Sequence, residues 1–354
     1  MNLLSRYLMR TILQSTVLVL GVLLALAGLF QFIGNLDDVR GDYQMPQVFL
    51  YSVLRMPQIA FEMLPMAALI GSLLGLGALA NKSELVVMRT AGISVARLAG
   101  MVATSGVVLL VLTGLIGEYI APPVEYFARN MRSEARLSQS DRAGGNPAWV
   151  KDGELILHLE QVNSEFEFGG VYLYRFTDDQ RLASIARAEN SGITDDEQWL
   201  LENFRETRFS NAGVQTTSSS VTLEALDIDS GVLGITLVKP VSLSARGLVG
   251  YINYLRRNEL SSIRYEMELW SRIATTTTVA LMPVLALAFV FGSLRSAGAG
   301  SRLMIGVMIG LGYFLASETL ANSGQVFNLN PAIISWIPTL VLLGVTVFAL
   351  ARVR

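Results

Sequence analysis

The sequence predicts an α-helical membrane protein with six transmembrane helices, arranged three plus three around an inserted, all-β, jelly-roll-like domain. Hydrophobic residues make up 52% of the 354-residue chain and charged residues 16%, and the mean hydropathy is +0.47. The apolar residues are gathered into six runs that are long enough to cross a bilayer. Between the third and fourth runs, residues 122–267 are more polar, and much of this stretch shows the two-residue period of β-strands.

Composition excludes several classes of protein. A formal net charge of −2 argues against a nucleic-acid partner. The chain has no cysteine, which removes disulfides, thiol nucleophiles and thiolate metal sites. Its single histidine, His158, lies in an alternating run and is expected on a strand, so we expect no metal site and no cofactor. Arg6 and Arg10 precede the first apolar run without an obvious cleavage site, which predicts a retained first helix.

The six spans are expected at residues 12–34, 59–80, 98–120, 273–294, 303–321 and 333–351. The distribution of lysine and arginine among the loops predicts the orientation of these spans in the membrane. Basic residues gather at both termini and in the loops after the second and fourth spans: Arg6, Arg10, Lys82, Arg89, Arg97, Arg295, Arg302, Arg352 and Arg354. The opposite short loops offer only Arg40 and Arg55, beside Asp37, Asp38 and Asp42. We therefore expect cytoplasmic termini, helical parts at 1–121 and 268–354, and an external domain at 122–267.

A short charged segment, NKSELVVMRTAGIS at residues 81–94, joins the second and third spans on the expected cytoplasmic side. Ser83 can cap a helix, Glu84 meets the positive end of its dipole, and Gly92 is a natural stop. The result is about two turns of helix, too short to span a bilayer. Two interpretations stay open on these residues alone: a hairpin tip at the membrane surface, or a docking helix gripped by a cytosolic partner.

The spans themselves carry few charges. Glu62, Glu118 and Glu318 fall at the external ends of their helices, either as interface carboxylates or as the polar rim of a cavity. None lies at the bilayer middle, which disfavours a proton relay. The second and fifth spans are rich in glycine, which allows close helix packing and, alternatively, a surface that slides or opens: Gly71, Gly75, Gly77, Gly306, Gly310 and Gly312.

The external domain is expected to begin with a helix at residues 124–136 that carries Arg129, Arg132 and Arg136. A hairpin about Asp152-Gly153 should pair residues 149–151 with 154–159, because Asp-Gly suits a type I′ turn. A β-sandwich or jelly-roll layer is predicted from these and from further runs at 170–176, 182–188, 198–202, 206–209, 214–217, 221–223 and 234–238. Ser244 should cap a helix that leads towards the fourth span.

Catalytic motifs are lacking. The sequence contains no G-x-S-x-G, no H-E-x-x-H and no glycine-rich dinucleotide loop after a strand. Residues 77–83 superficially resemble a P-loop, but Asn81 replaces the second glycine and an apolar helix precedes it. We therefore expect a non-enzymatic chain, with any ATP hydrolysis carried out by a different chain.

The run MLPMAALIGSLLGLGALANKSELVVMRTAGIS, residues 63–94, resembles the LptF/LptG family of lipopolysaccharide-export permeases. So do GEY with AP at 117–122, ARNMR at 128–132 and LWSR at 269–272. The order of these motifs and the three-plus-three spans match that family along essentially the whole chain. The residues around SELVVM and ARN are closer to the LptG branch.

The resemblance implies a permease subunit of an ABC-type transporter in the Gram-negative inner membrane. Such a subunit pairs with LptF on a dimer of the ATPase LptB. Together they extract lipopolysaccharide from the outer leaflet and pass it to LptC and the periplasmic bridge. Residues 82–94 would be the coupling helix, with Glu84 as the polar contact to LptB. The contacts to LptB would come from Glu84, Leu85, Val87, Met88 and Arg89.

A cavity that binds a phosphorylated, multi-chain lipid needs apolar walls and a cationic rim. The resemblance implies that the first and fifth spans, the latter with Gly306, Gly310 and Gly312, supply this chain's walls and gates. The phosphate ligands would be Arg40, Arg129, Arg132 and Arg136, because guanidinium suits phosphate; for Arg136 a solvated helix face is the alternative. LptG-type relatives can carry lysines just after the first span, whereas Asp37 and Asp38 stand here. The rim is therefore expected to be weaker on this side, or shifted to residues 129–136 or to the partner chain.

Two other classes of protein remain open. One is a membrane-anchored sensor or scaffold whose β domain binds a protein, although six spans with a docking helix exceed what an anchor needs. The other is a proton-driven lipid or drug transporter, which the lack of mid-membrane carboxylates disfavours. Co-purification of an ATPase separates the permease from the first class, and dependence of transport on the proton gradient separates it from the second.

Overall fold

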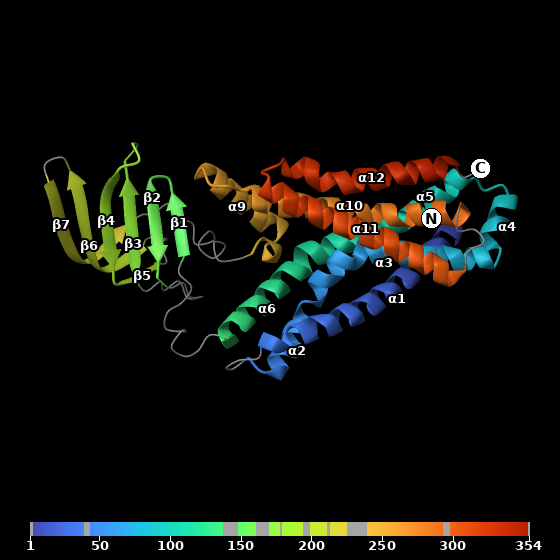
Figure 1. Cartoon of the computed structure of the whole chain (residues 1–354), viewed down its shortest axis with the longest axis horizontal. Coiled ribbons are helices and arrows are strands. Elements are labelled where there is room, and N and C mark those ends of the chain that lie inside the picture. Colours follow the sequence, from blue (N-terminus) through green and yellow to red (C-terminus); the bar gives the residue numbers. More distant parts are fainter. Residues whose placement is uncertain are drawn as a thin grey trace. The chain divides into compact units, whose positions relative to one another are not determined.

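The computed structural model describes residues 3–38, 43–136, 148–160, 170–177, 179–193, 199–210, 213–224, 239–292 and 298–352. The chain divides into two compact units (Figure 1). The helical unit comprises Met1–Val39, Tyr43–Asn130 and Ile263–Arg354. The β unit comprises Arg40–Asp42 and Met131–Ser262.

Among the described residues, six helices are long and apolar enough to cross a membrane, which confirms the predicted number of spans. They include α1 (Leu3–Gly34), α3 (Met56–Asn81), α5 (Val95–Leu115), α10 (Ile263–Phe291), α11 (Ala299–Val326) and α12 (Pro331–Arg352). Most of them extend beyond the apolar runs of the sequence; α1 begins at Leu3, for example, rather than at residue 12. Hydropathy marks only the part that suits lipid, whereas a helix continues as long as its backbone hydrogen bonds are made.

Among the described residues, three shorter helices lie wholly or partly in the helical unit: α2 (Met45–Leu54), α4 (Glu84–Thr90) and α6 (Ala121–Arg136), whose residues from Met131 on belong to the β unit. α5 continues through a π-helical turn, Ile116–Ile120, directly into α6. α6 confirms the helix expected at 124–136. α2 was not predicted, because its 10 residues are apolar but too few to span a bilayer.

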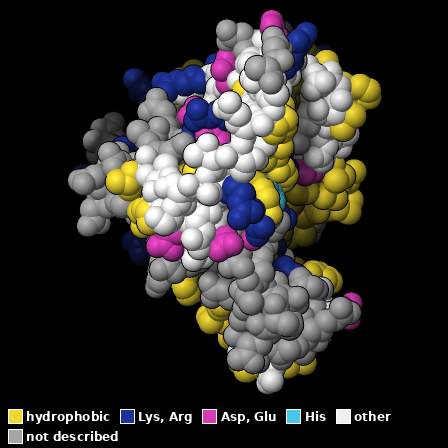
Figure 2. Space-filling view, turned by 90° about the vertical axis from the view of Figure 1, so that its left-hand side faces the viewer, with side chains coloured by type: hydrophobic (Ala, Val, Ile, Leu, Met, Phe, Trp, Pro, Cys, Tyr) yellow, Lys and Arg dark blue, Asp and Glu magenta, His cyan; other side chains and the backbone are white. Residues whose placement is uncertain are grey.

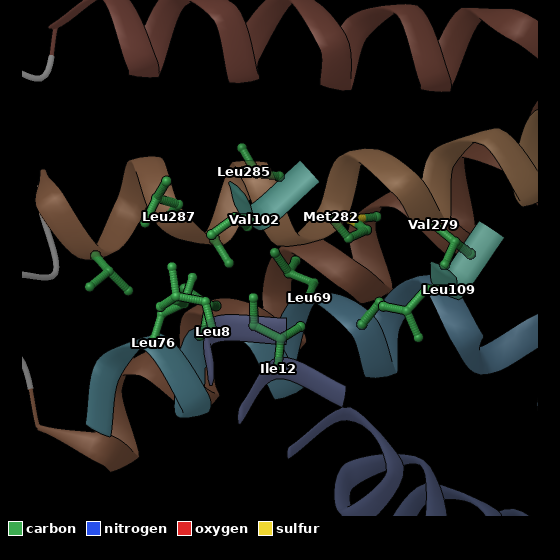
Figure 3. Packing of buried hydrophobic residues seen from close by; sticks show 14 of the residues in the cluster. Leu8, Ile12, Leu69, Leu76, Val102, Leu109, Val279, Met282, Leu285 and Leu287 are labelled. Carbon is green, nitrogen blue, oxygen red and sulfur yellow. The ribbon is translucent and has the colours of Figure 1, made fainter. Parts of the chain in front are cut away.

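The core of the helical unit is centred on α3 and α10. Of their most apolar stretches, 72% and 56% of the residues are buried, against 11% for both α1 and α11. Figure 3 shows side chains of four helices meeting in this core: Leu8 and Ile12 of α1, Leu69 and Leu76 of α3, Val102 and Leu109 of α5, and Val279, Met282, Leu285 and Leu287 of α10. Because α1 and α11 lie outside α3, each leaves an apolar face exposed for lipid or for another protein.

Glycines on α3 and α11 allow close helix contacts. A Cβ on Gly71 would lie 2.5 Å from the Cα of Thr16 on α1. Gly306 and Gly310 of α11 face Ile70 and Met66 of α3, so both have the packing role expected of them. Gly312 has no described atom of this chain within 4 Å of a Cβ position, so its predicted part in a gate or in helix packing stays a prediction. Residues 306 and 310 share a helix face, whereas 312 is turned away from it.

The β unit confirms an inserted β domain. Its seven described strands form one curled antiparallel sheet in the order β1-β2-β3-β4-β6-β5, with β7 also paired to β6 (Figure 1). They are β1 (Ala148–Asp152), β2 (Leu155–Leu159), β3 (Val171–Phe176), β4 (Leu182–Ala188), β5 (Asn190–Ile193), β6 (Trp199–Ser210) and β7 (Gly213–Glu224). The strand predicted at 234–238 lies outside the described residues.

Strand details differ from the sequence expectations in three ways, of which the simplest is that β5 was not predicted. Asp152 pairs with Leu155, so the hairpin loop is Gly153-Glu154 rather than Asp152-Gly153, and Gly153 supplies its positive φ of 55°. The two strands expected at 198–202 and 206–209 are one strand, β6, and those expected at 214–217 and 221–223 are one strand, β7. β6 continues because its first half pairs with β5 and its second half with β4, while Asn203 between them adopts a φ of 51°.

Helix α9 (Ala245–Arg257) contacts the first hairpin of the sheet. Ser244 accepts a hydrogen bond from the Gly247 amide at 3.2 Å, which confirms the predicted cap. The Tyr254 hydroxyl donates to the Lys151 carbonyl at 2.7 Å, and Asn258 just beyond the helix accepts from the Gly153 amide at 2.7 Å. These contacts fix α9 against β1 and the loop that follows it.

Candidate functional site

α4 lies at the same end of the helical unit as the beginning of α1 and the end of α12, while α2 and α6 lie at the opposite end (Figure 1). This grouping agrees with the basic-residue pattern, which predicts one common side for the termini and α4. The cytoplasmic identity of that side stays a prediction. Each end carries a different set of charged residues.

The ends of α4 were predicted from Ser83 and Gly92. Gly92 terminates the helix with a φ of 89°, and the Ile93 amide donates back to the Met88 carbonyl at 3.2 Å, a helix stop of the expected kind. Ser83 precedes the helix, but its φ is 60° and its side chain makes no capping hydrogen bond. The predicted side-chain cap is therefore wrong, because a cap of that type needs an extended backbone at this position.

Leu85 turns inward from α4. It is 1% exposed and belongs to the core cluster shared by α1, α3, α5 and α10. Its side chain anchors this helix of seven residues in the core, and its predicted contact with a partner stays a prediction. Met88 is half-buried against the same core. Leu85 thus fixes which face of α4 points outward.

The outward face of α4 carries both charge and apolar area. Val87 is 63% exposed and Val86, which sequence analysis missed, is 41% exposed. Glu84 accepts a hydrogen bond from the Tyr7 hydroxyl of α1 at 2.7 Å. The exposed Arg89 has its guanidinium 5.7 Å from the ring centre of Phe291. We call Glu84, Val86, Val87, Met88 and Arg89 the docking surface.

A buried arginine lies near the docking surface. Arg302 of α11 is 1% exposed, and its Nη2 donates to Oδ1 of Asn81 at 3.1 Å. A Cβ on Gly77 would lie 2.5 Å from Nη1 of the same arginine, so glycine is needed there. Gly77 and Asn81 are four residues apart on one face of α3. Arg302 therefore fixes α11 to the end of α3, from which the chain turns into α4.

The opposite end of the helical unit contains a fully buried carboxylate. Glu125 of α6 is 0% exposed and lies between two arginines. Its Oε2 is 3.2 Å from Nε of Arg55, and its Oε1 is 2.6 Å from Nη2 of Arg129. Nη1 of Arg55 donates to Oε1 of Gln31 on α1 at 3.2 Å. We call Gln31, Arg55, Glu125 and Arg129 the clasp, because they join α1, the start of α3, and α6.

Of the four predicted phosphate ligands, Arg129 and Arg132 have side chains among the described residues. Arg129 is part of the clasp and has an internal counter-ion. Arg132 follows it on α6 and is half-buried. The side chain of Arg136 and the whole of Arg40 lie outside the described residues. Glu125 was not predicted as a site residue, although its four-residue spacing from Arg129 is typical of a helical ion pair.

In the β unit, aromatic and basic side chains occupy paired positions on neighbouring strands: Trp149, His158, Tyr172 and Arg187. The predicted strand position of His158 is confirmed on β2, with its ring centre 4.3 Å from that of Trp149 and 5.9 Å from that of Tyr172. Tyr172, Arg187 and Ser218 help to line a cavity of about 560 Å³ on this sheet. Figure 2 shows basic and hydrophobic side chains side by side on the exposed surface of the molecule.

Metal chemistry finds no support in the described residues, where no group of three or more His, Asp or Glu side chains could hold an ion. Six described helices that are long and apolar enough to span a bilayer, together with an inserted β domain, define a multi-pass membrane protein. The chain belongs to the family of lipopolysaccharide export system permeases LptF/LptG, which it matches over residues 6–352.

Two relatives illustrate the match. The lipopolysaccharide export system permease protein LptG of Escherichia coli strain K12 is 32% identical over 352 residues, which cover 99% of this chain and 98% of that protein. The LptG protein of Haemophilus influenzae is 31% identical over 355 residues, which cover 100% and 99%. The similarity therefore includes both helical parts and the β domain.

Proposed function

We propose that this chain is the permease subunit of an ABC-type transporter that extracts lipopolysaccharide from the outer leaflet of the inner membrane. The observation that carries the proposal is the full-length similarity to lipopolysaccharide export permeases of the LptG type. The lipid would then pass to LptC and the periplasmic bridge. Both termini would be cytoplasmic and the β unit periplasmic, as the distribution of lysine and arginine favours.

ATP hydrolysis would belong to a separate dimer, LptB, because this chain has no phosphate-binding loop. LptB would grip the docking surface, where Val86 and Val87 offer apolar area and Glu84 and Arg89 offer charge. Closure of the ATPase would push on α4. Since Leu85 anchors α4 in the core, that push would reach the packed helices rather than move a loose loop.

A second permease, LptF, would complete the cavity. The exposed apolar faces of α1 and α11 support a role for these two helices as this chain's walls and gates. The acyl chains of the lipid would contact those faces, because burial of hydrocarbon favours apolar surroundings. The phosphates would meet Arg129 and Arg132 on α6, with Arg40 and Arg136 as further ligands, since guanidinium groups bind phosphate in a bidentate manner.

Co-purification tests the proposal. The chain would be co-expressed with LptB, LptF and LptC, purified in detergent, and assayed for ATPase activity and for lipid transfer to LptC. We expect a stable complex in which transfer of lipopolysaccharide requires ATP. A well-folded chain that brings down no ATPase would contradict the proposal.

A matched pair of variants makes that test specific to the docking surface. Val87→Asp adds a charge to α4, whereas Val214→Asp adds the same charge at a position of equal exposure on β7, 63% against 64%. We expect Val87→Asp to weaken recovery of LptB about tenfold or more, since a buried unpaired charge is costly at an interface. Val214→Asp should leave recovery unchanged. Equal effects of the two variants would remove α4 from the interface.

A further inference from the structure

The charges of the clasp do not balance. Two guanidinium groups, from Arg55 and Arg129, share the single carboxylate of Glu125. With Gln31 neutral, these four side chains carry one excess positive charge, and Glu62 of α3 is a further carboxyl group that interacts electrostatically with Arg55. Clusters of this kind attract anions, and the attraction is strongest where water is partly excluded.

The excess charge faces outward. The Glu125 side chain is 0% exposed, whereas those of Arg55 and Arg129 are 22% and 26% exposed. Nε of Arg129 is buried and has no hydrogen-bond partner among the described residues. The carboxylate is thus sealed behind two arginines whose outer edges remain accessible to a ligand.

We infer that Arg55 and Arg129 form a two-arginine phosphate site, in which Glu125 is the resident counter-ion and the ligand is a phosphomonoester. The inference deepens the proposed function, on which it rests, by adding Arg55 as a ligand and Glu125 as a positioning residue. A phosphomonoester carries more negative charge than a carboxylate and offers three acceptor oxygens. It can therefore take the outer donors of both arginines while Glu125 keeps the inner ones.

Binding of a phosphate at this site would affect the attachment of α1 through Arg55. Nη1 of Arg55 is the atom that donates to Gln31, and the same nitrogen is one of those a phosphate would attract. Nη1 carries two N–H groups, so competition arises through the position of the guanidinium: a phosphate that draws it outward lengthens the hydrogen bond to Gln31. Binding of the phosphate loosens the attachment of α1 to the clasp, so that the lipid headgroup itself favours movement of this helix.

A photocrosslinking experiment tests this inference on the full-length chain in nanodiscs. A photoreactive phenylalanine would replace Tyr126, which neighbours Glu125 in sequence and is 44% exposed. The probes are lipopolysaccharide and the same lipopolysaccharide after enzymatic removal of its phosphates. The variants are Arg55→Gln, Glu125→Gln and Gln31→Ala, with Arg6→Gln as an exposed arginine control at the other end of α1.

The variants have distinct expected results. Arg55→Gln should lower the yield for the phosphorylated lipid about tenfold, because it removes a charge-assisted bidentate contact. Glu125→Gln should raise that yield several-fold, and Gln31→Ala about twofold, since each removes a competitor for the guanidinium. Arg6→Gln, and every variant with the dephosphorylated lipid, should match the parent chain. Arg55→Lys should restore only part of the yield.

Three outcomes separate the possible explanations. Unchanged phosphate-dependent yields in Arg55→Gln and Gln31→Ala, both stably folded, would overturn the inference and leave the clasp as a structural ion pair. A parent chain that captures no lipopolysaccharide and recovers no ATPase would contradict the proposed function instead. Competition by millimolar inorganic phosphate supports recognition of phosphate alone, whereas variant effects without such competition support recognition of the lipid-anchored group.

Discussion

Helix α1 is attached in different ways at its two ends. Near its start, the Tyr7 hydroxyl donates to Glu84 of the docking surface at 2.7 Å, and this contact is exposed. Near its end, Gln31 accepts from Arg55, which is itself held by the fully buried Glu125. Between the two, α1 packs closely on α3 at Gly71 and Gly75.

This difference shows which attachment can change when a partner binds. An exposed hydrogen bond exchanges readily with water and contributes little to stability. A sealed carboxylate between two arginines is costly to break, because the remaining charges stay poorly solvated. Helix α1 therefore links an exposed docking end to a lipid end that is held firmly until a phosphate draws on Arg55.

The largest expected effect is at the buried end. Glu125→Ala removes the counter-ion of two arginines and should lower the free energy of unfolding by about 3 kcal/mol. Glu84→Ala at the exposed end should cause no measurable loss. Thermal unfolding of both variants in detergent measures this contrast, and equal losses would mean that the two ends do not differ.

These two ends also show what the sequence could predict. Hydropathy locates the six spans, and Gly92 locates the end of α4, because both depend on residues close together in the chain. The Arg55–Glu125 and Arg302–Asn81 contacts join residues 70 and 221 positions apart, so no local pattern reveals them. The inward turn of Leu85 is equally hidden, since a seven-residue helix is too short to show a reliable apolar face.

The strands of the β unit were predicted with uneven accuracy, because strand pairing is also a contact between distant parts of the chain. Runs with clear apolar alternation, such as β2 and β4, were located closely. β7 was divided into two strands, because its exposed Thr and Ser residues between Val214 and Val221 show no alternation. Its continuity comes from unbroken pairing with β6, a contact that the sequence does not display.

The second prediction compares two faces of α4. Leu85→Ala leaves a cavity in the core and should lower the free energy of unfolding by about 3 kcal/mol. Val87→Ala, at a position that is 63% exposed, should change it by less than about 0.5 kcal/mol. The same unfolding measurement applies, and a large loss in Val87→Ala would show that this side chain belongs to the core.

The third prediction concerns the middle of α1. Gly71→Ala places a Cβ 2.5 Å from the backbone of Thr16, so α1 and α3 must separate, at a cost of about 2 kcal/mol. Gly114→Ala is the matched control, because its nearest neighbour is the Thr276 methyl at 3.8 Å. We expect lipid transfer to fall in Gly71→Ala and to persist in Gly114→Ala. Equal transfer in both would argue against a packed α1 as the connection.

The smallest effect is expected at a second buried carboxylate, in the β unit, whose two arginine partners are more exposed than those of the clasp. Glu206 of the β unit is 5% exposed and pairs with Arg175 and Arg208, whose side chains are 36% and 67% exposed. Burial alone would raise the pKa of Glu206, but hydrogen bonds from Arg208 and Ser184 and the charges of both arginines outweigh it, so the pKa is lowered. Glu206→Gln should cost about 1 kcal/mol.

The lowered pKa gives that prediction a pH signature. The stabilisation is present above the unfolded-state pKa of about 4.3 and is lost as the pH falls through the lower folded-state value. Hydrogen exchange of the β3 and β6 amides in the full-length chain measures it. The difference between parent and Glu206→Gln should shrink on acidification, and a constant difference would contradict the pKa direction.

The most direct test of the account follows α1 in the assembled transporter. The chain has no native cysteine, so spin labels can be placed at Ile33 of α1 and Phe127 of α6, both exposed. We predict that a non-hydrolysable ATP analogue, bound to the partner ATPase, shifts the distance distribution between them. The shift should disappear when Val87→Asp disrupts the docking surface. An unchanged distribution in the parent complex, or an identical shift in the variant, would contradict the proposed connection through α1.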